Sequence, residues 1–176
     1  MARIEIWNGD ICDLEVDAIV TPANGSLWMS TGVAGAIKRA GGDAIEFAAI
    51  RQGPVETGSA VVTPAGTLAA RWVIHAVSLD RDRRTSAEAL ERAVRSAMAR
   101  AREIGATSVA LPALGSGVGG FPLEEGARIT VRTVRDELEV DSSVAHVVFA
   151  LRGAAAYQAF SQALQEETAV SPGASQ

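Results

Sequence analysis

The chain has 176 residues, 48% of them hydrophobic and 21% charged, which is the balance of a globular protein and excludes a disordered chain. Its net charge of −5 argues against holding nucleic acid through phosphates, so we expect no direct sequence-specific nucleic-acid binding. One cysteine rules out an intramolecular disulfide and, with two histidines, argues against a zinc site; we expect neither a metal nor a cofactor. The sequence contains no run of about 18 apolar residues and no apolar signal core, which predicts a cytoplasmic protein without a membrane span.

Strand and helix patterns alternate along the chain. In chain order, they predict a strand at Ile4–Trp7, a strand at Asp17–Thr21, helices at Gly32–Ala40 and Asp43–Arg51, strands at Ser59–Thr63 and Trp72–Val77, a helix from the N-cap Ser86 to Ile104, a strand at Ser108–Leu111, a helix from Pro122 to Leu138, a strand at Val144–Phe149 and a helix at Ala154–Leu164. This alternation favours right-handed crossovers between parallel strands.

The expected fold class is therefore α/β, with a mixed, largely parallel sheet between helices in a three-layer α/β/α sandwich. We assign residues 1–165 to a single domain, because no internal repeat or linker divides the chain. The first strand could pair antiparallel at a sheet edge, and the sequence leaves this open. Residues 166–176 are polar and contain proline and glycine, so we expect a disordered C-terminal tail.

Three segments lie at the ends of predicted strands, where ligands bind in open α/β sheets. Gly9-Asp10-Ile11 follows the first strand, and Pro22-Ala23-Asn24 with the stretch to Gly35 follows the second. The third is the glycine-rich loop Gly115-Ser116-Gly117-Val118-Gly119-Gly120, which precedes a helix. Glycines let a main chain approach phosphate closely, and a helix N-terminus favours an anion. The loop has no lysine after its last glycine and is not a P-loop; a tight turn explains its glycine content equally well.

Four motifs in this order resemble the macrodomain family. They are Gly9-Asp10-Ile11, then Val16-Asp17-Ala18-Ile19-Val20-Thr21-Pro22-Ala23-Asn24, then Gly32-Val33-Ala34-Gly35-Ala36-Ile37, then Pro112-Ala113-Leu114-Gly115-Ser116-Gly117-Val118-Gly119-Gly120-Phe121-Pro122. The resemblance runs from about Ile4 to about Leu164. It implies the macrodomain α/β/α sandwich, and a monomer that binds ADP-ribose or an ADP-ribosylated macromolecule.

The resemblance also implies a role for individual residues. Asp10 would accept a hydrogen bond from the adenine amino group beside the Ile11 amide, and Asn24 would face the distal ribose. Two loops would hold the diphosphate through main-chain amides: Gly32, Val33, Ala34 and Gly35 in one, and Ser116, Gly117, Val118 and Gly119 in the other. Phe149 would stack on the adenine, and Phe121 would border the distal ribose.

The sequence departs from the family pattern at several positions. The family's Asn-Ala-Ala-Asn is Thr21-Pro22-Ala23-Asn24 here, and the glycine run before the first phosphate loop is Met29-Ser30-Thr31-Gly32. Ala34 stands where many family hydrolases have an aspartate, and Gly119 where a tyrosine is common. Neither diphosphate loop carries a carboxylate, so the usual general base is missing.

Two kinds of function therefore remain. The interpretation that we prefer is a hydrolase that removes mono-ADP-ribose from acidic side chains or nucleic acid. Its mechanism would be substrate-assisted: the ligand's own phosphate would orient a water near Asn24 and Gly117, and tight positioning would replace the base. The alternative is a non-catalytic reader of ADP-ribose, which Ala34 favours. Deacetylation of O-acetyl-ADP-ribose is a third activity that the same site would serve.

Several other polar or aromatic residues have a plain structural interpretation. His75 lies on an apolar strand and is expected in the core, and Lys38 is expected to be solvated. Trp28 is either a lid over the ribose or a packing residue. The segment Asp80-Arg81-Asp82-Arg83-Arg84 is expected to be a charged surface loop; a less favoured alternative makes Asp80 or Asp82 a substitute acid.

Overall fold

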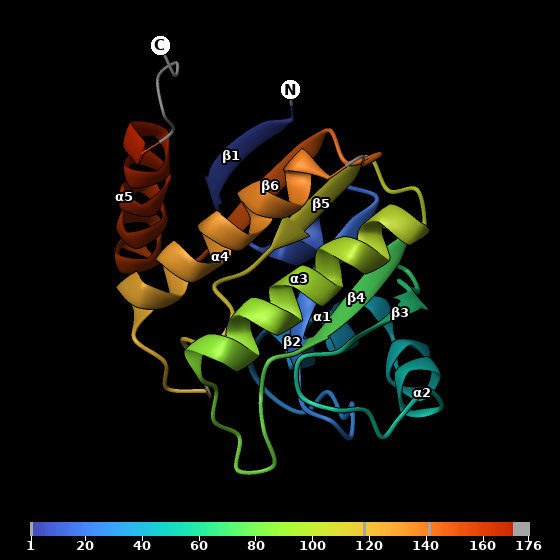
Figure 1. Ribbon diagram of the computed structural model, residues 1–176. Helices are drawn as coiled ribbons and strands as arrows, with labels where there is room; N and C mark the ends of the chain where they lie inside the picture. Colours follow the sequence, from blue (N-terminus) through green and yellow to red (C-terminus); the bar gives the residue numbers. More distant parts are fainter. Residues whose placement is uncertain (1, 118, 141, 171–176) are drawn as a thin grey trace.

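The computed structural model describes residues 2–117, 119–140 and 142–170, and Figure 1 shows its elements. In chain order they are β1 (Arg3–Asn8), the short 3-10 helix η1 (Ile11–Asp13), β2 (Ala18–Ala23), α1 (Gly32–Gly41), α2 (Ala44–Ile50), β3 (Ala60–Pro64), β4 (Trp72–Val77), α3 (Ala87–Glu103), β5 (Ser108–Leu111), α4 (Leu123–Glu139), β6 (His146–Leu151) and α5 (Ala154–Val170). Every predicted strand and helix is present. The ends differ slightly: Pro122 caps α4 and does not open it.

The strands form one six-stranded sheet in the order β1-β6-β5-β2-β4-β3. Neighbouring strands are parallel except β3, which pairs antiparallel with β4. The sheet is thus mixed and largely parallel, as the alternation of elements predicted. The direction of the first strand, which the sequence left open, is parallel to β6; the antiparallel edge strand is β3.

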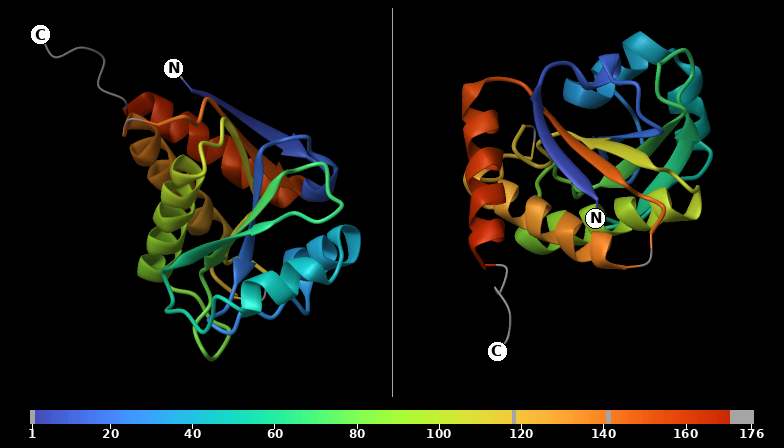
Figure 2. Two further views of the ribbon diagram at one scale, coloured as in Figure 1. Left: turned by 90° about the vertical axis from the view of Figure 1, so that its right-hand side faces the viewer. Right: turned by 90° about the horizontal axis from the view of Figure 1, so that it is seen from above.

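Helices cover both faces of the sheet (Figures 1 and 2). Leu90 of α3, Val131 of α4 and Phe160 of α5 belong to the buried cluster on one face. Ile37 of α1 and Ile45 of α2 belong to the cluster on the opposite face. The arrangement is the three-layer α/β/α sandwich expected from the sequence.

Strand β6 sends alternate side chains to the two faces, as the two-residue period of a strand requires. Val147, Phe149 and Leu151 pack with α3, α4 and α5, whereas Val148 and Ala150 pack on the α1 and α2 side. This assignment of faces decides which residues at the end of β6 can reach a ligand.

The sheet opens between β2 and β5. Strand β2 pairs with β4 along its whole length, but with β5 it shares a register only at Ala18–Val109 and Ile19–Ala110. Beyond these pairs β2 continues to Ala23 paired with β4, whereas β5 ends at Leu111 and passes into the glycine-rich loop. A crevice at the carboxyl ends of parallel strands is where ligands bind in this class of sheet.

The sequence analysis predicted a disordered tail from residue 166, and this start is too early. Helix α5 continues past Leu164 to Val170, so residues 166–170 are helical; residues 171–176 lie outside the described residues. The reason is that Gln165, Glu166 and Glu167 are good helix formers despite their polarity. In the described part of the chain, no helix has both the length and the apolar character needed to cross a membrane.

Candidate functional site

A cavity of about 430 Å³ lies where β2, β5 and β6 end. Its wall comes from residues 22–24 at the end of β2, residues 30–34 at the start of α1, residues 112, 113, 115–117 and 119 after β5 and residues 150–152 at the end of β6. The volume is typical of a small-molecule site, and its position at the opening of the sheet is the one predicted for a ligand.

The start of α1 presents main-chain N–H groups to this cavity. Gly32, Val33 and Ala34 line it, and the first helical bond of α1 is the one from the Gly35 amide to Thr31 O, 3.1 Å. Thr31 makes no side-chain capping bond, so the amides before Gly35 keep their hydrogens for a ligand. Gly32 has a φ of 60°, a conformation that favours glycine.

The glycine-rich loop closes on itself and faces the same cavity. Phe121 N donates to Gly115 O over 2.9 Å and Gly120 N to Gly117 O over 3.1 Å. Among the hydrogen bonds of the described residues, none uses the main-chain N–H of Ser116, Gly117 or Gly119, and all three residues line the cavity. The tight turn is therefore present, and amides that it leaves uncommitted belong to residues on the cavity wall. Val118 lies outside the described residues.

Asn24 is held with its amide group in a defined orientation. Its Oδ1 accepts hydrogen bonds from Ser26 N (3.1 Å), Ser26 Oγ (2.6 Å) and Leu27 N (3.1 Å). Because these partners donate, the oxygen of the amide is assigned to them and the NH₂ group is the one available to a ligand. Asn24 also lines the cavity, so it offers donors there and not an acceptor.

Asp10 reaches the cavity through Arg152. Its Oδ1 accepts the Cys12 amide hydrogen at 2.9 Å and caps η1, and its Oδ2 accepts from Arg152 Nη2 at 2.9 Å. The hydrogen bond from the Cys12 amide holds the pKa of Asp10 below its ordinary value, and the charge of Arg152 acts in the same direction. Arg152 lines the cavity, whereas Asp10 and the buried Ile11 do not. The sequence analysis did not single out Arg152, although it directly follows the last strand.

Three other predicted site residues do not line the cavity. Phe149 is fully buried, with its ring centroid 5.1 Å from that of Phe160, because its position in β6 faces α5. Phe121 packs against the same core. The Gly35 amide is already bonded within α1. Phe149 therefore has no exposed face for the stacking role expected of it, and the ribose contact expected of the partly buried Phe121 stays a prediction.

The charge on the cavity wall is positive. Among the described residues that form it are two arginines, Arg83 and Arg152, and no carboxylate. Asp80 does not line this cavity; its Oδ1 accepts from Asp82 N (2.8 Å) and Arg84 N (3.0 Å) and shapes the loop. The alternative of Asp80 as a substitute acid in this cavity is thus not supported. Two guanidinium groups and free amides suit a ligand with two negative charges.

A buried ion pair supports the segment that precedes α1. Glu46 accepts from Met29 N at 2.6 Å and from Lys38 Nζ at 2.8 Å. Burial raises the pKa of Glu46, but the hydrogen bonds from Lys38 and Met29 outweigh it and hold the pKa below its ordinary value. Lys38, expected to be solvated, is in fact this partner. The contact fixes the main chain beside Trp28, whose half-exposed side chain lines the cavity.

The remaining titratable candidates lie away from the cavity. Burial, followed by the charge of Asp10, raises the pKa of Cys12 to about 11, so its thiol is a poor nucleophile at neutral pH. His75 is in the core as expected, with Nε2 2.9 Å from Thr63 Oγ1, and burial lowers its pKa to about 4. No group of three or more potential metal ligands occurs in the part of the chain that the structure describes.

The fold and the cavity together define an α/β domain with a cavity at the strand ends, whose described wall carries uncommitted main-chain amides and two arginines. The family model described as Macro domain matches residues 20–130, which include most of β2, all of α1 and the glycine-rich loop. The chain belongs to the macrodomain family.

Two relatives illustrate the range of the family. The uncharacterized protein Rv1899c of Mycobacterium tuberculosis is 43% identical over 171 residues, which cover 96% of this chain and 47% of that protein. This chain therefore spans about half the length of that relative. A Salmonella gallinarum protein named O-acetyl-ADP-ribose deacetylase is 44% identical over 141 residues, 77% of this chain and 79% of its own length.

Two solved structures share the fold. A Trypanosoma brucei macrodomain in complex with ADP-ribose has a TM-score of 0.84 and 28% identity, and the match covers 92% of this chain and 68% of that one. An Oceanobacillus iheyensis macrodomain mutant with ADPR has a TM-score of 0.85 and 26% identity, covering 94% and 92% of the two chains.

Proposed function

We propose that the chain binds ADP-ribose in the 430 Å³ cavity and, as a monomer, hydrolyses mono-ADP-ribose from modified acceptors, acidic side chains or nucleic acid. The observation that carries this proposal is the pair of loops whose uncommitted amides face a single cavity without a carboxylate. Such amides bind phosphate oxygens without needing a basic protein. The macrodomain complex with ADP-ribose and the relative named as a deacetylase support the same ligand class.

The order of the strands determines the orientation that we assign to the ligand along the cavity. Arg152 follows β6, the glycine-rich loop follows β5 and Asn24 follows β2, and these strands are consecutive in the sheet. Two strand spacings make about 10 Å between the outer ends. We assign the adenine to the Arg152 end, where Asp10 can accept from its amino group, the diphosphate to the two loops, and the distal ribose to Asn24.

The proposed hydrolysis uses the ligand itself as the base. Water adds to the anomeric carbon of the distal ribose, the bond from that carbon to the acceptor oxygen breaks, and the proton of the water passes to a phosphate oxygen. The Asn24 NH₂ group donates to the water oxygen and the Gly117 main chain limits its position. A glycosyl ester is already activated, so positioning supplies the main rate gain.

Two alternatives have a specific observation in their favour. Ala34 occupies the α1 loop without offering a carboxylate, which favours a reader that binds ADP-ribose without turnover. The Salmonella relative favours O-acetyl-ADP-ribose as the substrate, since the same site would present its ester to the same water.

A turnover assay with matched substrates tests the proposal. The protein is incubated with glutamate-linked mono-ADP-ribosylated protein and, separately, with O-acetyl-ADP-ribose, and released ADP-ribose is followed over time against buffer. If ADP-ribose is released from the glutamate-linked protein faster than in buffer alone, the result supports the hydrolase. Calorimetric binding of ADP-ribose with no release from either substrate selects the reader, and release from the second substrate alone selects the deacetylase.

A further inference from the structure

A second cavity of about 830 Å³ adjoins the first. Its wall is formed by residues 24–26 after β2, residues 54–57 before β3, and residues 80, 81 and 83 in the loop after β4. Asn24 and Arg83 line both cavities, so the two spaces share a wall at the end that we assign to the distal ribose. A group attached to the distal ribose would leave the first cavity in this direction.

Hydrogen bonds hold the walls of this second cavity in place. Val55 N donates to Gly25 O at 3.0 Å, which ties the segment before β3 to the turn that carries Asn24. In the loop after β4, Asp80 N donates to Arg84 O (2.8 Å) and Arg83 N donates to Asp80 O (3.1 Å). Arg83 is held with a φ of 60°, an unusual conformation for a residue with a side chain. The cavity is therefore built before any ligand arrives.

The charged groups on the wall of the second cavity differ in whether they already have an ion-pair or hydrogen-bond partner within the protein. Among the described residues, Arg81 and Arg83 form no ion pair and no side-chain hydrogen bond, and the exposed Glu56 likewise has no such partner. The Asp80 carboxylate is occupied by the amides of the loop. The wall of the second cavity thus carries two unpaired guanidinium groups and one unpaired carboxylate, although the net charge of the whole chain is −5.

We infer that this second cavity receives the acceptor of the proposed reaction, and that the acceptor is an acidic segment of polypeptide; the inference rests on the proposed function. Carboxylates of the segment pair with Arg81 and Arg83, because a planar guanidinium matches a carboxylate with two hydrogen bonds. Main-chain N–H groups of the segment donate to Glu56.

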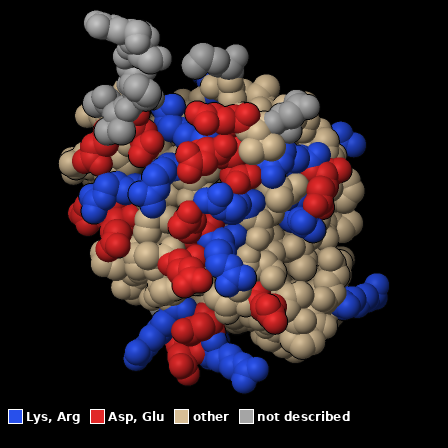
Figure 3. Space-filling view, viewed as in Figure 1, with Lys and Arg blue, Asp and Glu red and all other residues tan. Residues whose placement is uncertain are grey.

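A nucleic-acid acceptor fits the same wall less well. A phosphodiester backbone has no hydrogen-bond donor for Glu56 and would be repelled by its charge. Over the face covered by α3 and α4, acidic and basic side chains alternate (Figure 3), so this face offers no continuous basic surface for a strand to follow.

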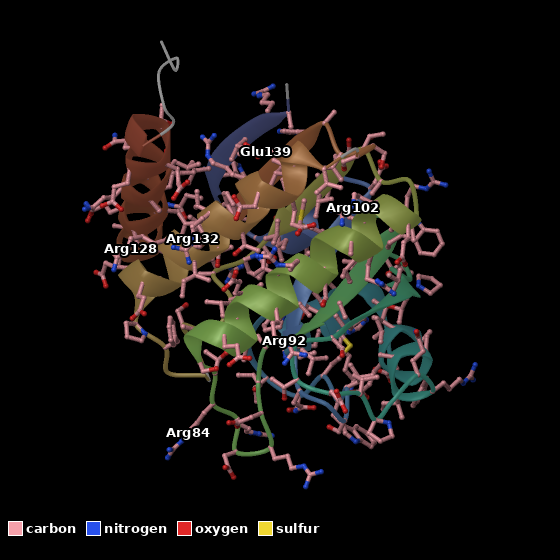
Figure 4. All side chains as sticks on the ribbon, in the orientation of Figure 1. Arg84, Arg92, Arg102, Arg128, Arg132 and Glu139 are labelled. Carbon is pink, nitrogen blue, oxygen red and sulfur yellow. The ribbon has the colours of Figure 1, made fainter. Side chains whose placement is uncertain are left out.

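The experiment compares two ligands and two variants. Dissociation constants are measured for free ADP-ribose and for an acidic peptide that carries ADP-ribose on one side chain through a hydrolysis-resistant linkage. Arg81→Ala removes a guanidinium that lines the second cavity alone. Arg84→Ala is the matched control, since Arg84 lies in the same loop, lines neither cavity and points away from the fold (Figure 4).

The expected result is that the wild-type protein binds the peptide conjugate more tightly than free ADP-ribose. Arg81→Ala should weaken binding of the conjugate about fivefold and leave ADP-ribose binding unchanged, while Arg84→Ala changes neither. Glu56→Ala is a second, independent variant, and it should also weaken the conjugate selectively.

Three results would overturn the inference. They are equal affinity of the wild-type protein for the conjugate and for ADP-ribose, equal losses in Arg81→Ala and Arg84→Ala, and a larger Arg81-dependent gain for an ADP-ribosylated oligonucleotide than for the peptide. Failure of the proposed function is distinguishable, because the wild-type protein would then either not bind free ADP-ribose or release none from the glutamate-linked substrate, whereas the comparison of Arg81→Ala with Arg84→Ala measures binding of the conjugate alone.

Discussion

The Nη2 atom of Arg152 lies 2.9 Å from Oδ2 of Asp10, and this ion pair joins the wall of the cavity to the turn after β1. The pair spans the neighbouring strands β1 and β6. Because the Cys12 amide occupies the other oxygen, the carboxylate has a fixed orientation. A ligand amino group must share Oδ2 with Arg152 or displace it.

We predict that Asp10→Ala weakens ADP-ribose binding by about 1.5–3 kcal/mol, the value of a charge-assisted hydrogen bond. Isothermal titration calorimetry measures the loss. Asp13→Ala is the control, since Asp13 lies on the same short helix and is exposed. Asp10→Asn separates capping from recognition, because it keeps an acceptor for the Cys12 amide but loses the charge. Wild-type affinity in both Asp10 variants would show that adenine binds elsewhere.

Substitutions at Gly117 should separate the effect of a small added side chain on ADP-ribose binding from the effect of an added carboxylate. An added Cβ at this position would meet no atom within 4 Å, so Gly117→Ala is expected to fold and to bind ADP-ribose nearly as well as the wild type. Gly117→Glu should fold equally well, by circular dichroism, but lose binding, because its carboxylate fills the anion cradle and repels the diphosphate. Undiminished binding by Gly117→Glu would rule out this loop as the diphosphate site.

Asn24→Asp tests the donor role of the amide. The substitution keeps Oδ1 for Ser26 and Leu27, so the turn should remain intact, but it replaces the NH₂ group by an acceptor. We expect the single-turnover rate on glutamate-linked substrate to fall about 100-fold, as for the loss of one catalytic donor. Ser26→Ala removes a partner of Oδ1 without changing the NH₂ group, and it should stay near the wild-type rate. A wild-type rate in Asn24→Asp would contradict the proposed water site.

The pair of Lys38 and Glu46 should stabilise the fold jointly. Lys38→Ala leaves a nearly fully buried carboxylate with the Met29 amide as its remaining partner, and we expect a measurable loss in the free energy of unfolding. The double variant Lys38→Ala with Glu46→Gln should lose less than the sum of the single variants, because the uncompensated charge is gone. Urea denaturation measures all three, and strictly additive losses would contradict a coupled pair.

His75 should make the stability depend on pH. Burial lowers its pKa to about 4 from 6.5, so between these values the unfolded chain takes up a proton that the folded chain does not. The folding stability is therefore lost as the pH falls from about 6.5 towards about 4, by up to about 1.4 kcal/mol per pH unit. His75→Gln should flatten this part of the profile, measured by urea denaturation. If the slope of folding stability against pH were unchanged in His75→Gln, the assignment of this pH dependence to His75 would be wrong.

The sequence predicted the elements of the fold and part of the cavity wall, for a definite reason. Asn24 directly follows β2, and Gly32 and Gly117 lie in the connections that leave the carboxyl ends of β2 and β5, so the polarity of a parallel sheet brings them to one edge whatever the details of packing. The position of Phe149 could not be predicted in this way. Strand β6 is apolar on both faces, and nothing local tells which side of the sheet a given residue faces.

Exposed charges were a second obstacle for prediction from the sequence. Arg152 and Arg83 look like solvated residues in a linear reading, and their importance arises from which strands are neighbours in the sheet. The length of α5 was underestimated because a polar end carries no stop signal before Pro172.

The short pairing of β2 with β5 has a consequence for dynamics. The register at Ala18–Val109 and Ile19–Ala110 is the seam between β1-β6-β5 and β2-β4-β3, and past it the two halves of the sheet have no ladder in common. An anion bound by amides from both halves would connect them at this point, where the strands make no main-chain hydrogen bonds to each other. Occupancy of the crevice would then slow the exchange of amide hydrogens in β2 and β5 more than in the edge strands β1 and β3.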